Sequence, residues 1–431
     1  MRIKDIHIEN FKGIEVNDFA FNNQFTVLIG DNGRGKSSIL DAVSIGLGTI
    51  LMKSGAEFGY GGAKSRSLFK SEIRKVIITP DNSELSNVLL KGTFVFNGKE
   101  LSWKRAQPVT STSLSFSEAD SLTNLGEEFA RNLKIELNLP LFAHYTTARL
   151  WGIMYDRKVK FKKLSSRLDG YYACLDSRSV KNNFLVWFKT YEDSVLKFNK
   201  DKDLYQAFTQ AIITMVKDWK EIRFSWDHDD ILGKTASGNW LPLKNLSDGY
   251  RGIVNLAADI AYRAIKLNPH LGERAVLDTE GIVLIDEIDM HLHPKWQRHI
   301  VSDLKKTFPK VQFIATTHSP FIVQSLNADE IINLDGEDIL EDPFTKSIEE
   351  IVEQDMDMPG INRSQKFLKY QQVAARYFDL IQKGKNSVCD DETKELKFEL
   401  DRLELEFIDD PVYVALMQAE RKSELKKDET N

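Results

Sequence analysis

An eight-residue loop near the start of the chain constrains its fold most strongly. Residues 30–37 read Gly-Asp-Asn-Gly-Arg-Gly-Lys-Ser and match the P-loop pattern. The apolar run Phe25–Ile29 before it predicts a buried strand, and the residues from Ser37 onward predict a helix. A Gly-rich turn between a strand and a helix directs backbone N–H groups and the positive helix end toward phosphates. The loop therefore predicts an α/β protein with a nucleoside triphosphate site.

The loop itself supplies most of the predicted nucleotide contacts. Lys36 is expected to reach the β- and γ-phosphates, and the Ser37 hydroxyl is expected to hold Mg²⁺. ATP and Mg²⁺ are therefore the expected cofactors. The predicted nucleotide-binding residues of the loop are Asn32, Gly33, Gly35, Lys36, Ser37 and Ser38.

Two later strand-like segments end in residues suited to phosphate chemistry. The apolar run 281–285 is followed directly by Asp286 and Glu287. An Asp at the end of a buried parallel strand lies beside a P-loop and can hold Mg²⁺, and Glu287 is then placed to activate the attacking water as a general base. A third run, 312–318, ends in His318, which suits a site at the carboxyl edge of a sheet.

The hexapeptide Leu246–Arg251 lies between the P-loop and the strand-like run 281–285. The order of P-loop, hexapeptide, Asp286–Glu287 and His318 resembles that of the ATP-binding cassette ATPases. The resemblance implies a two-lobe head of the P-loop NTPase fold. It assigns Ser247 and Gly249 to a signature motif that contacts the nucleotide of a second subunit, so a homodimer with sandwiched ATP is expected. It also assigns His318 as the switch histidine at the γ-phosphate and Asp289 as the D-loop aspartate.

The signature hexapeptide departs from the commoner Leu-Ser-Gly-Gly-Gln. Asp248 and Tyr250 stand in place of Gly and Gln, and they are expected to tune ATP hydrolysis without abolishing it. Arg251 is the candidate partner that would neutralise Asp248 near a triphosphate. Gln107, after a strand-like segment, is the candidate Q-loop residue.

Composition sets bounds on partners and compartment. The net charge of the 431 residues is −6, so a nucleic-acid contact requires a local patch or a partner. The two cysteines, Cys174 and Cys389, provide no disulfide framework and fit a reducing cytoplasm. The longest apolar stretch, Val43–Met52, is too short to span a bilayer, and the first residues alternate like a strand and do not resemble a signal peptide. We expect a cytoplasmic protein without membrane contact.

Apolar residues recur at helical spacing in five ranges: 182–191, 204–219, 371–383, 392–405 and 411–424. The range 330–334 predicts one more strand. Together with the motifs, these elements divide the chain into four predicted segments. The segments are an ATPase lobe with the P-loop (1–150), a helical insert (151–225), a second ATPase lobe with the signature, Walker B, D-loop and switch histidine (226–340), and a helical C-terminal interaction module (341–431).

Three clusters raise metal-site alternatives. His291 and His293 could share a strand face, but the D-loop context favours loop packing. Asp227–Asp230 fits a polar hairpin edge better than a metal site. Asp355 and Asp357 match the Asp-x-Asp of Toprim nucleases, yet they follow a helical pattern, which disfavours a Toprim site.

The strand-turn-strand entry at residues 3–14 resembles the RecF, Rad50 and OLD-nuclease branch of the superfamily. With the stretch Asp286–Gln297 and the short helical C-terminus, it is similar to the PtuA family, the ATPase subunits of Septu and some retron anti-phage systems. That resemblance implies a partner HNH nuclease of the PtuB type and, in a retron, a reverse transcriptase with its noncoding RNA. DNA would be contacted through the complex. Two alternatives remain: a RecF-like repair or recombination ATPase, and a nucleotide-sensing scaffold that hardly hydrolyses ATP.

Overall fold

The computed structural model describes two compact units, Met1–Ile351 and Val352–Asn431. The structure describes residues 1–54, 72–79, 82–108, 118–133, 137–147, 166–175, 183–198, 202–336, 339–357, 365–383 and 391–405. The predicted helix at 411–424 lies outside these residues.

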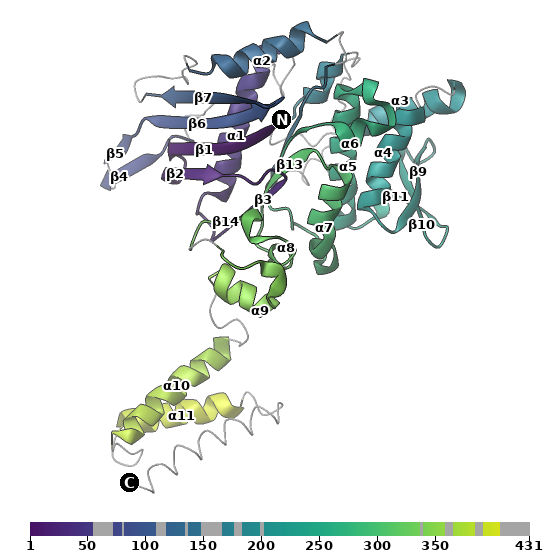
Figure 1. Ribbon diagram of the computed structural model, residues 1–431. Helices are drawn as coiled ribbons and strands as arrows, with labels where there is room; N and C mark the ends of the chain where they lie inside the picture. Colours follow the sequence, from purple (N-terminus) through teal and green to yellow (C-terminus); the bar gives the residue numbers. More distant parts are fainter. Residues whose placement is uncertain are drawn as a thin grey trace. The chain divides into compact units, whose positions relative to one another are not determined.

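A five-stranded parallel sheet forms the centre of the first unit (Figure 1), with strand order β14-β3-β13-β12-β8. Every residue of β3, β8, β12 and β13 is buried, as expected for parallel strands covered on both faces. This sheet confirms the predicted α/β class, and β14 confirms the extra strand. The bounds are Phe25–Ile29 (β3), Leu141–Tyr145 (β8), Gly281–Ile285 (β12), Val311–Thr316 (β13) and Ile331–Asn333 (β14).

A second, antiparallel sheet has the order β2-β1-β6-β7 and contains the predicted strand-turn-strand entry. Helix α1 (Lys36–Leu51) contacts β1 as well as β8, β12 and β13, so the P-loop helix links the two sheets. Helix α2 (Asp120–Arg131) packs on α1 and β7. The strands are Arg2–Phe11 (β1), Ile14–Ala20 (β2), Val88–Phe96 (β6) and Lys99–Gln107 (β7), and Lys75–Thr79 (β4) pairs with Asn82–Leu85 (β5).

The region before the signature motif contains both helices and strands. The helix predicted to extend to Trp219 ends earlier, because Trp219 begins β9 and pairs with Thr235 of β10. A Cβ at Gly233 would collide with the Trp219 ring, so the ring lies flat on the neighbouring strand. The elements are α3 (Asn183–Phe198), α4 (Lys202–Met215), β9 (Trp219–Ser225), β10 (Asp230–Thr235), β11 (Trp240–Pro242) and α5 (Asp248–Leu267).

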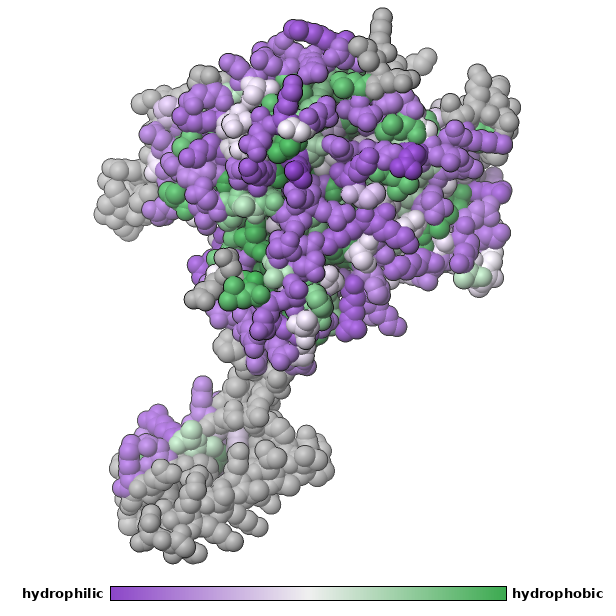
Figure 2. Space-filling view, in the orientation of Figure 1, coloured by the Kyte–Doolittle hydropathy of each residue, from purple (hydrophilic) through white to green (hydrophobic). Residues whose placement is uncertain are grey.

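Short helices complete the first unit. These short helices are α6 (Ala275–Asp278), α8 (Pro320–Val323) and α9 (Ile348–Glu350), and the longer α7 spans Pro294–Thr307. A turn of π-helix at Ile351–Asp355 begins at the last residue of the first unit and continues into the second. On the face shown in Figure 2, hydrophilic side chains cover most of this unit, and hydrophobic ones show between them. Within the described residues, no helix has the length and apolar character needed to cross a membrane.

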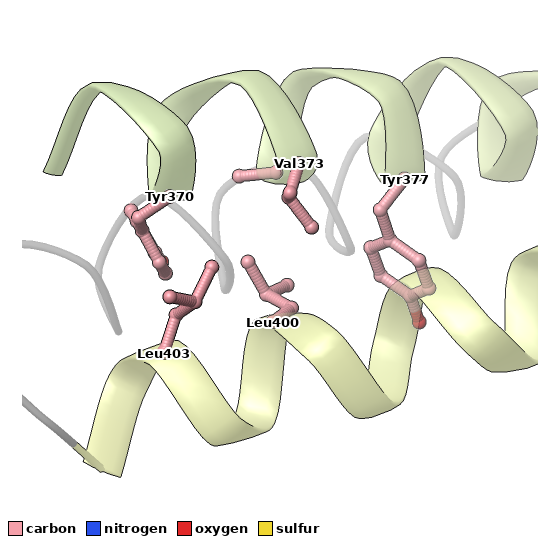
Figure 3. Packing of buried hydrophobic residues seen from close by; sticks show 6 residues of the cluster. Tyr370, Val373, Tyr377, Leu400 and Leu403 are labelled. Carbon is pink, nitrogen blue, oxygen red and sulfur yellow. The ribbon is translucent and has the colours of Figure 1, made fainter. Parts of the chain in front are cut away.

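The second unit contains a helical hairpin of α10 (Gln365–Gln382) and α11 (Asp391–Leu405). Tyr370, Val373 and Tyr377 on α10 point toward Leu400 and Leu403 on α11 (Figure 3). The apolar stripe predicted from helical spacing therefore packs within the hairpin at these positions. The exposed Phe398 lies outside this cluster.

Candidate functional site

The carboxyl edge of the parallel sheet gathers several of the predicted site residues and one further acid, Asp335. The P-loop follows β3, Asp286 follows β12, His318 follows β13 and Asp335 follows β14. Because parallel strands end at the same edge, loops that are far apart in the sequence meet there.

The P-loop has the backbone that its glycines allow. Gly33 and Gly35 have φ angles of 90° and 94°, in the left-handed region that favours glycine. The Lys36 ammonium folds back onto the loop, donating to the carbonyl oxygens of Gly30 and Asp31, the latter at 2.9 Å. Burial lowers the pKa of Lys36, against the opposing effect of the nearby Asp335 and Asp286 carboxylates. The side chain thus lies over the cradle where phosphates would bind.

Ser37 and Asp286 come together as predicted. The Ser37 hydroxyl donates to Asp286 Oδ1 at 3.0 Å, and the Thr316 hydroxyl donates to the same oxygen at 2.8 Å. A hydroxyl and a carboxylate from adjacent loops form the hard oxygen set that Mg²⁺ prefers beside phosphates. These residues therefore fit the expected Mg²⁺, which would supply charge neutralisation at the phosphates.

Glu287 lies beside this pair in a constrained backbone. Its φ of 49° is in the left-handed region, which is uncommon for a residue other than glycine. Its N–H donates to the Thr316 hydroxyl at 2.7 Å, and the next N–H, of Ile288, donates to the Thr316 carbonyl at 2.9 Å. These two hydrogen bonds hold the strained turn and leave the Glu287 side chain half-buried, where a water molecule can reach it.

The D-loop and the segment after β13 are joined by side chains. The Thr317 hydroxyl donates to Asp289 at 2.6 Å, and the Ser319 hydroxyl donates to Gln297 at 2.7 Å. His318, between them, is exposed. The loops that carry His318 and Asp289 are thus linked by a hydrogen bond, so a movement of one loop would displace the other.

The signature motif contacts the D-loop of its own chain. Gly249 approaches His291 so closely that a Cβ would collide with the His291 carbonyl oxygen. Arg251 pairs with Asp248, as predicted from charge. Among the described residues, no hydrogen bond or ion pair joins Ser247 or Gly249 to the P-loop of the same chain.

His293 and Asp229, one from each of the two metal-site alternatives near this region, make structural contacts. His293 caps α7 by accepting the N–H of Lys295 at 3.2 Å, and Asp229 pairs with Lys189 on the β9–β10 turn. In the part of the chain that the structure describes, no group of three or more His, Cys, Asp or Glu residues could hold a metal ion. Asp355 ends a turn of π-helix, where a Toprim pair would need strands. Gln107 ends β7 opposite Val88, and its Q-loop role stays a prediction.

Asp335 is a site residue that sequence reasoning missed. Its carboxylate accepts the Asp31 N–H and pairs with Arg34, so it contacts the P-loop twice. The signal was present, because Asp335 closely follows the predicted strand 330–334 just as Asp286 follows β12. Thr316, which links Asp286 to Glu287, is likewise absent from the predicted site residues.

Comparison with known proteins identifies relatives of the chain. A family model described as "AAA domain, putative AbiEii toxin, Type IV TA system" matches residues 25–324. The chain is 26% identical to "Retron Vc95 probable ATPase" of Vibrio cholerae serotype O1 biovar El Tor, covering 77% of this chain and 73% of that protein. It is 29% identical to "Septu protein PtuA" of Bacillus mycoides (strain KBAB4), covering 76% of this chain and 40% of that one. The resemblance predicted from the motifs is confirmed.

Among solved structures, the chain is similar to an SmcHead bound to the C-winged helix domain of ScpA. The sequence identity is 17% and the TM-score is 0.48, over 78% of this chain and 96% of that one.

Proposed function

Because this chain belongs to the AAA-domain family whose model spans residues 25–324, we propose that it is the ATP-hydrolysing subunit of an anti-phage defence complex. The convergence of Ser37, Asp286 and Thr316 beside Glu287 carries the proposal. Its similarity to the retron ATPase and to the Septu protein supports the defence role.

In the proposed reaction, each residue has one task. Lys36 leaves its loop carbonyls to hold the β- and γ-phosphates, and the P-loop N–H groups bind their oxygens. Ser37 and Asp286 would hold Mg²⁺, and Glu287 would accept a proton from the attacking water. His318 would contact the γ-phosphate from the adjacent loop.

The functional unit in this proposal is a homodimer. Among the residues with a described structure, neither Ser247 nor Gly249 is bonded to its own P-loop, and Gly249 lies against the His291 backbone. They would meet the γ-phosphate held by a second copy, and Asp289 would sense that closure through Thr317. ATP binding would thereby close two heads together.

The proposed complex includes a nuclease. An HNH nuclease of the PtuB type would supply DNA cleavage, and in a retron a reverse transcriptase and its RNA would join the assembly. The helical second unit is the proposed interaction module, and DNA would be contacted through the complex. ATP occupancy would change the angle between heads and so the nuclease's access to DNA.

Crosslinking tests the dimer directly. In a Cys174→Ser/Cys389→Ser background, Asn32→Cys and Asp248→Cys introduced in separate copies should crosslink only with ATP and Mg²⁺. Glu287→Gln should lower kcat by roughly 10²-fold or more, since general-base catalysis contributes about that much, and should prolong the crosslinkable state. Lys36→Ala should instead weaken ATP binding at least about tenfold, since charge-assisted hydrogen bonds are worth about 1.5–3 kcal/mol.

If the two cysteine-bearing copies with an otherwise wild-type active site crosslink equally with and without ATP and Mg²⁺, the proposed ATP-sandwich dimer is wrong. Turnover measured with and without DNA separates the alternatives. A rate raised by DNA without a nuclease partner would favour a repair ATPase, and binding without measurable turnover would favour a sensing scaffold.

A further inference from the structure

A pocket lies beside the signature motif. Its volume is about 530 Å³, and it is lined by residues of α7, by Tyr250 and by residues at and just after the end of α4. This volume is within the range of ligand pockets, which runs from about 300 to 1,000 Å³. The residues that give it chemical character are Asp218, Tyr250, Lys295, Trp296, Arg298 and His299.

Two aromatic rings meet in this pocket. Tyr250 and Trp296 have ring centroids 4.7 Å apart at an interplanar angle of 67°, an edge-to-face arrangement. The Tyr250 hydroxyl donates to Asp218, which fixes the tyrosine ring from the far end. Both aromatic side chains are only half-buried, so the pocket presents aromatic surface to a ligand.

Positive charge lies next to the aromatic rings. Lys217 is neutralised by Asp303 at 3.1 Å. Lys295 and Arg298 are exposed, and within the described residues neither takes part in an ion pair. The Arg298 guanidinium lies 5.1 Å from the Phe321 ring centre, which orients it without cancelling its charge. His299 adds a further donor on the same helix.

We propose that this pocket binds a nucleoside phosphate, with the base against Trp296 and the phosphate at Lys295 and Arg298. A flat base suits an aromatic surface, a phosphate suits unpaired cations, and the Asp218 carboxylate can accept from a base amine. The ligand is a free mononucleotide or one residue of a single strand, because both present this chemistry. A net charge of −6 makes such a local patch the form a nucleic-acid contact would take.

The pocket is separate from the P-loop and goes beyond the proposed ATPase function. Its link to that function is Tyr250, the residue after Gly249, which itself lies against the D-loop. A ligand that moved the Tyr250 ring would shift the signature motif. Occupancy is therefore expected to change the rate of ATP hydrolysis.

Binding is measured by fluorescence anisotropy of a labelled ten-nucleotide single strand, with full-length Lys36→Ala protein so that the P-loop does not contribute. Trp296→Ala should weaken binding about tenfold or more and Trp296→Phe only a few fold, because base–aromatic stacking is worth about 1–3 kcal/mol. Lys295→Glu/Arg298→Glu should weaken binding. It should also make the slope of log K against log salt concentration shallower by about one or two, the amount expected for the loss of one or two phosphate contacts. Lys306→Glu, on the exposed side of the same helix, is the matched control and should change neither.

Competition with AMP and with unlabelled strand distinguishes the two sources. Displacement by AMP identifies a mononucleotide site, and displacement by strand alone identifies a nucleic-acid site. Equal binding by the Lys36→Ala protein and by the same protein carrying Trp296→Ala or the charge reversals would overturn the proposal. The proposal would also be overturned if nucleotides did not bind and a Glu-rich peptide bound with the same dependence on Trp296. Since Lys295 and Arg298 are exposed, their variants remain informative even if Trp296→Ala unfolds.

Discussion

At the scale of single residues, Asp335 shows how the P-loop is held in place. A Cβ on Gly30 would collide with the Asp335 carboxylate, so the glycine allows this acid to reach the loop. From there it accepts the Asp31 N–H and neutralises Arg34. The phosphate cradle is thus braced by a residue about three hundred positions away.

Removing that brace should loosen the loop. We expect Asp335→Ala to speed amide hydrogen exchange at residues 30–34 about tenfold without nucleotide, since an unmade hydrogen bond costs about 1–3 kcal/mol. Asp335→Asn keeps an acceptor oxygen and should fall between Ala and wild type. Exchange is followed by mass spectrometry, and identical protection in all three proteins would show that the contact does not order the loop.

Gly249 provides a second test at this scale. Gly249→Ala forces the signature motif away from His291, and overpacking of this kind costs about 1–3 kcal/mol. We expect kcat to fall about tenfold or more while ATP affinity at the P-loop changes less than about twofold. Gly13→Ala is the control, because its Cβ would have only an ordinary contact, 3.7 Å from Gly33 O. Equal loss of kcat and of affinity would contradict a role confined to the signature.

At the scale of elements, sequence patterns predicted the strands that carry the site but not all of their partners. Phe25–Ile29 and the strand ending before Asp286 are continuous apolar runs, so their burial and their carboxyl-end residues could be read directly. The end of α4 could not be predicted in this way, because Trp219 fits a helical apolar stripe as well as a strand. Its pairing with Thr235 decided the outcome. Contacts such as Asp335 with Arg34 depend on which strands become neighbours, which local spacing does not encode.

The α10–α11 hairpin offers a prediction for one element pair. Leu400 is fully buried between the helices, whereas Phe398 on the same helix is 74% exposed. Leu400→Ala should lower the free energy of unfolding of the second unit by about 2–3 kcal/mol, and Phe398→Ala by less than about 0.5 kcal/mol. Thermal unfolding followed by circular dichroism, with ATPase activity assayed in parallel, measures both. Loss of ATPase activity in Leu400→Ala would contradict the division into two units.

At the scale of the whole molecule, the nucleotide site and the helical hairpin belong to different compact units. The first unit holds the residues proposed for ATP hydrolysis. The second packs its stripe internally at Tyr370, Val373 and Tyr377, which accounts for much of the apolar surface that a partner was expected to cover. The proposed partner would therefore have to recognise the outer, polar faces of the hairpin or another surface.

The chain alone is expected not to cut DNA. Asp355 is buried at the end of a π-helical turn and Asp357 has a φ of 50°, so the Asp-x-Asp match lacks the strand context of a Toprim site. Purified full-length protein that binds ATP should leave plasmid and linear DNA intact in Mg²⁺ or Mn²⁺, and adding the HNH nuclease should restore cleavage. Glu287→Gln in that mixture should change the cleavage rate if ATP turnover gates the nuclease. Cleavage by the chain alone that survives Lys36→Ala and disappears in Asp355→Ala/Asp357→Ala would place the nuclease in this chain and remove the need for a partner.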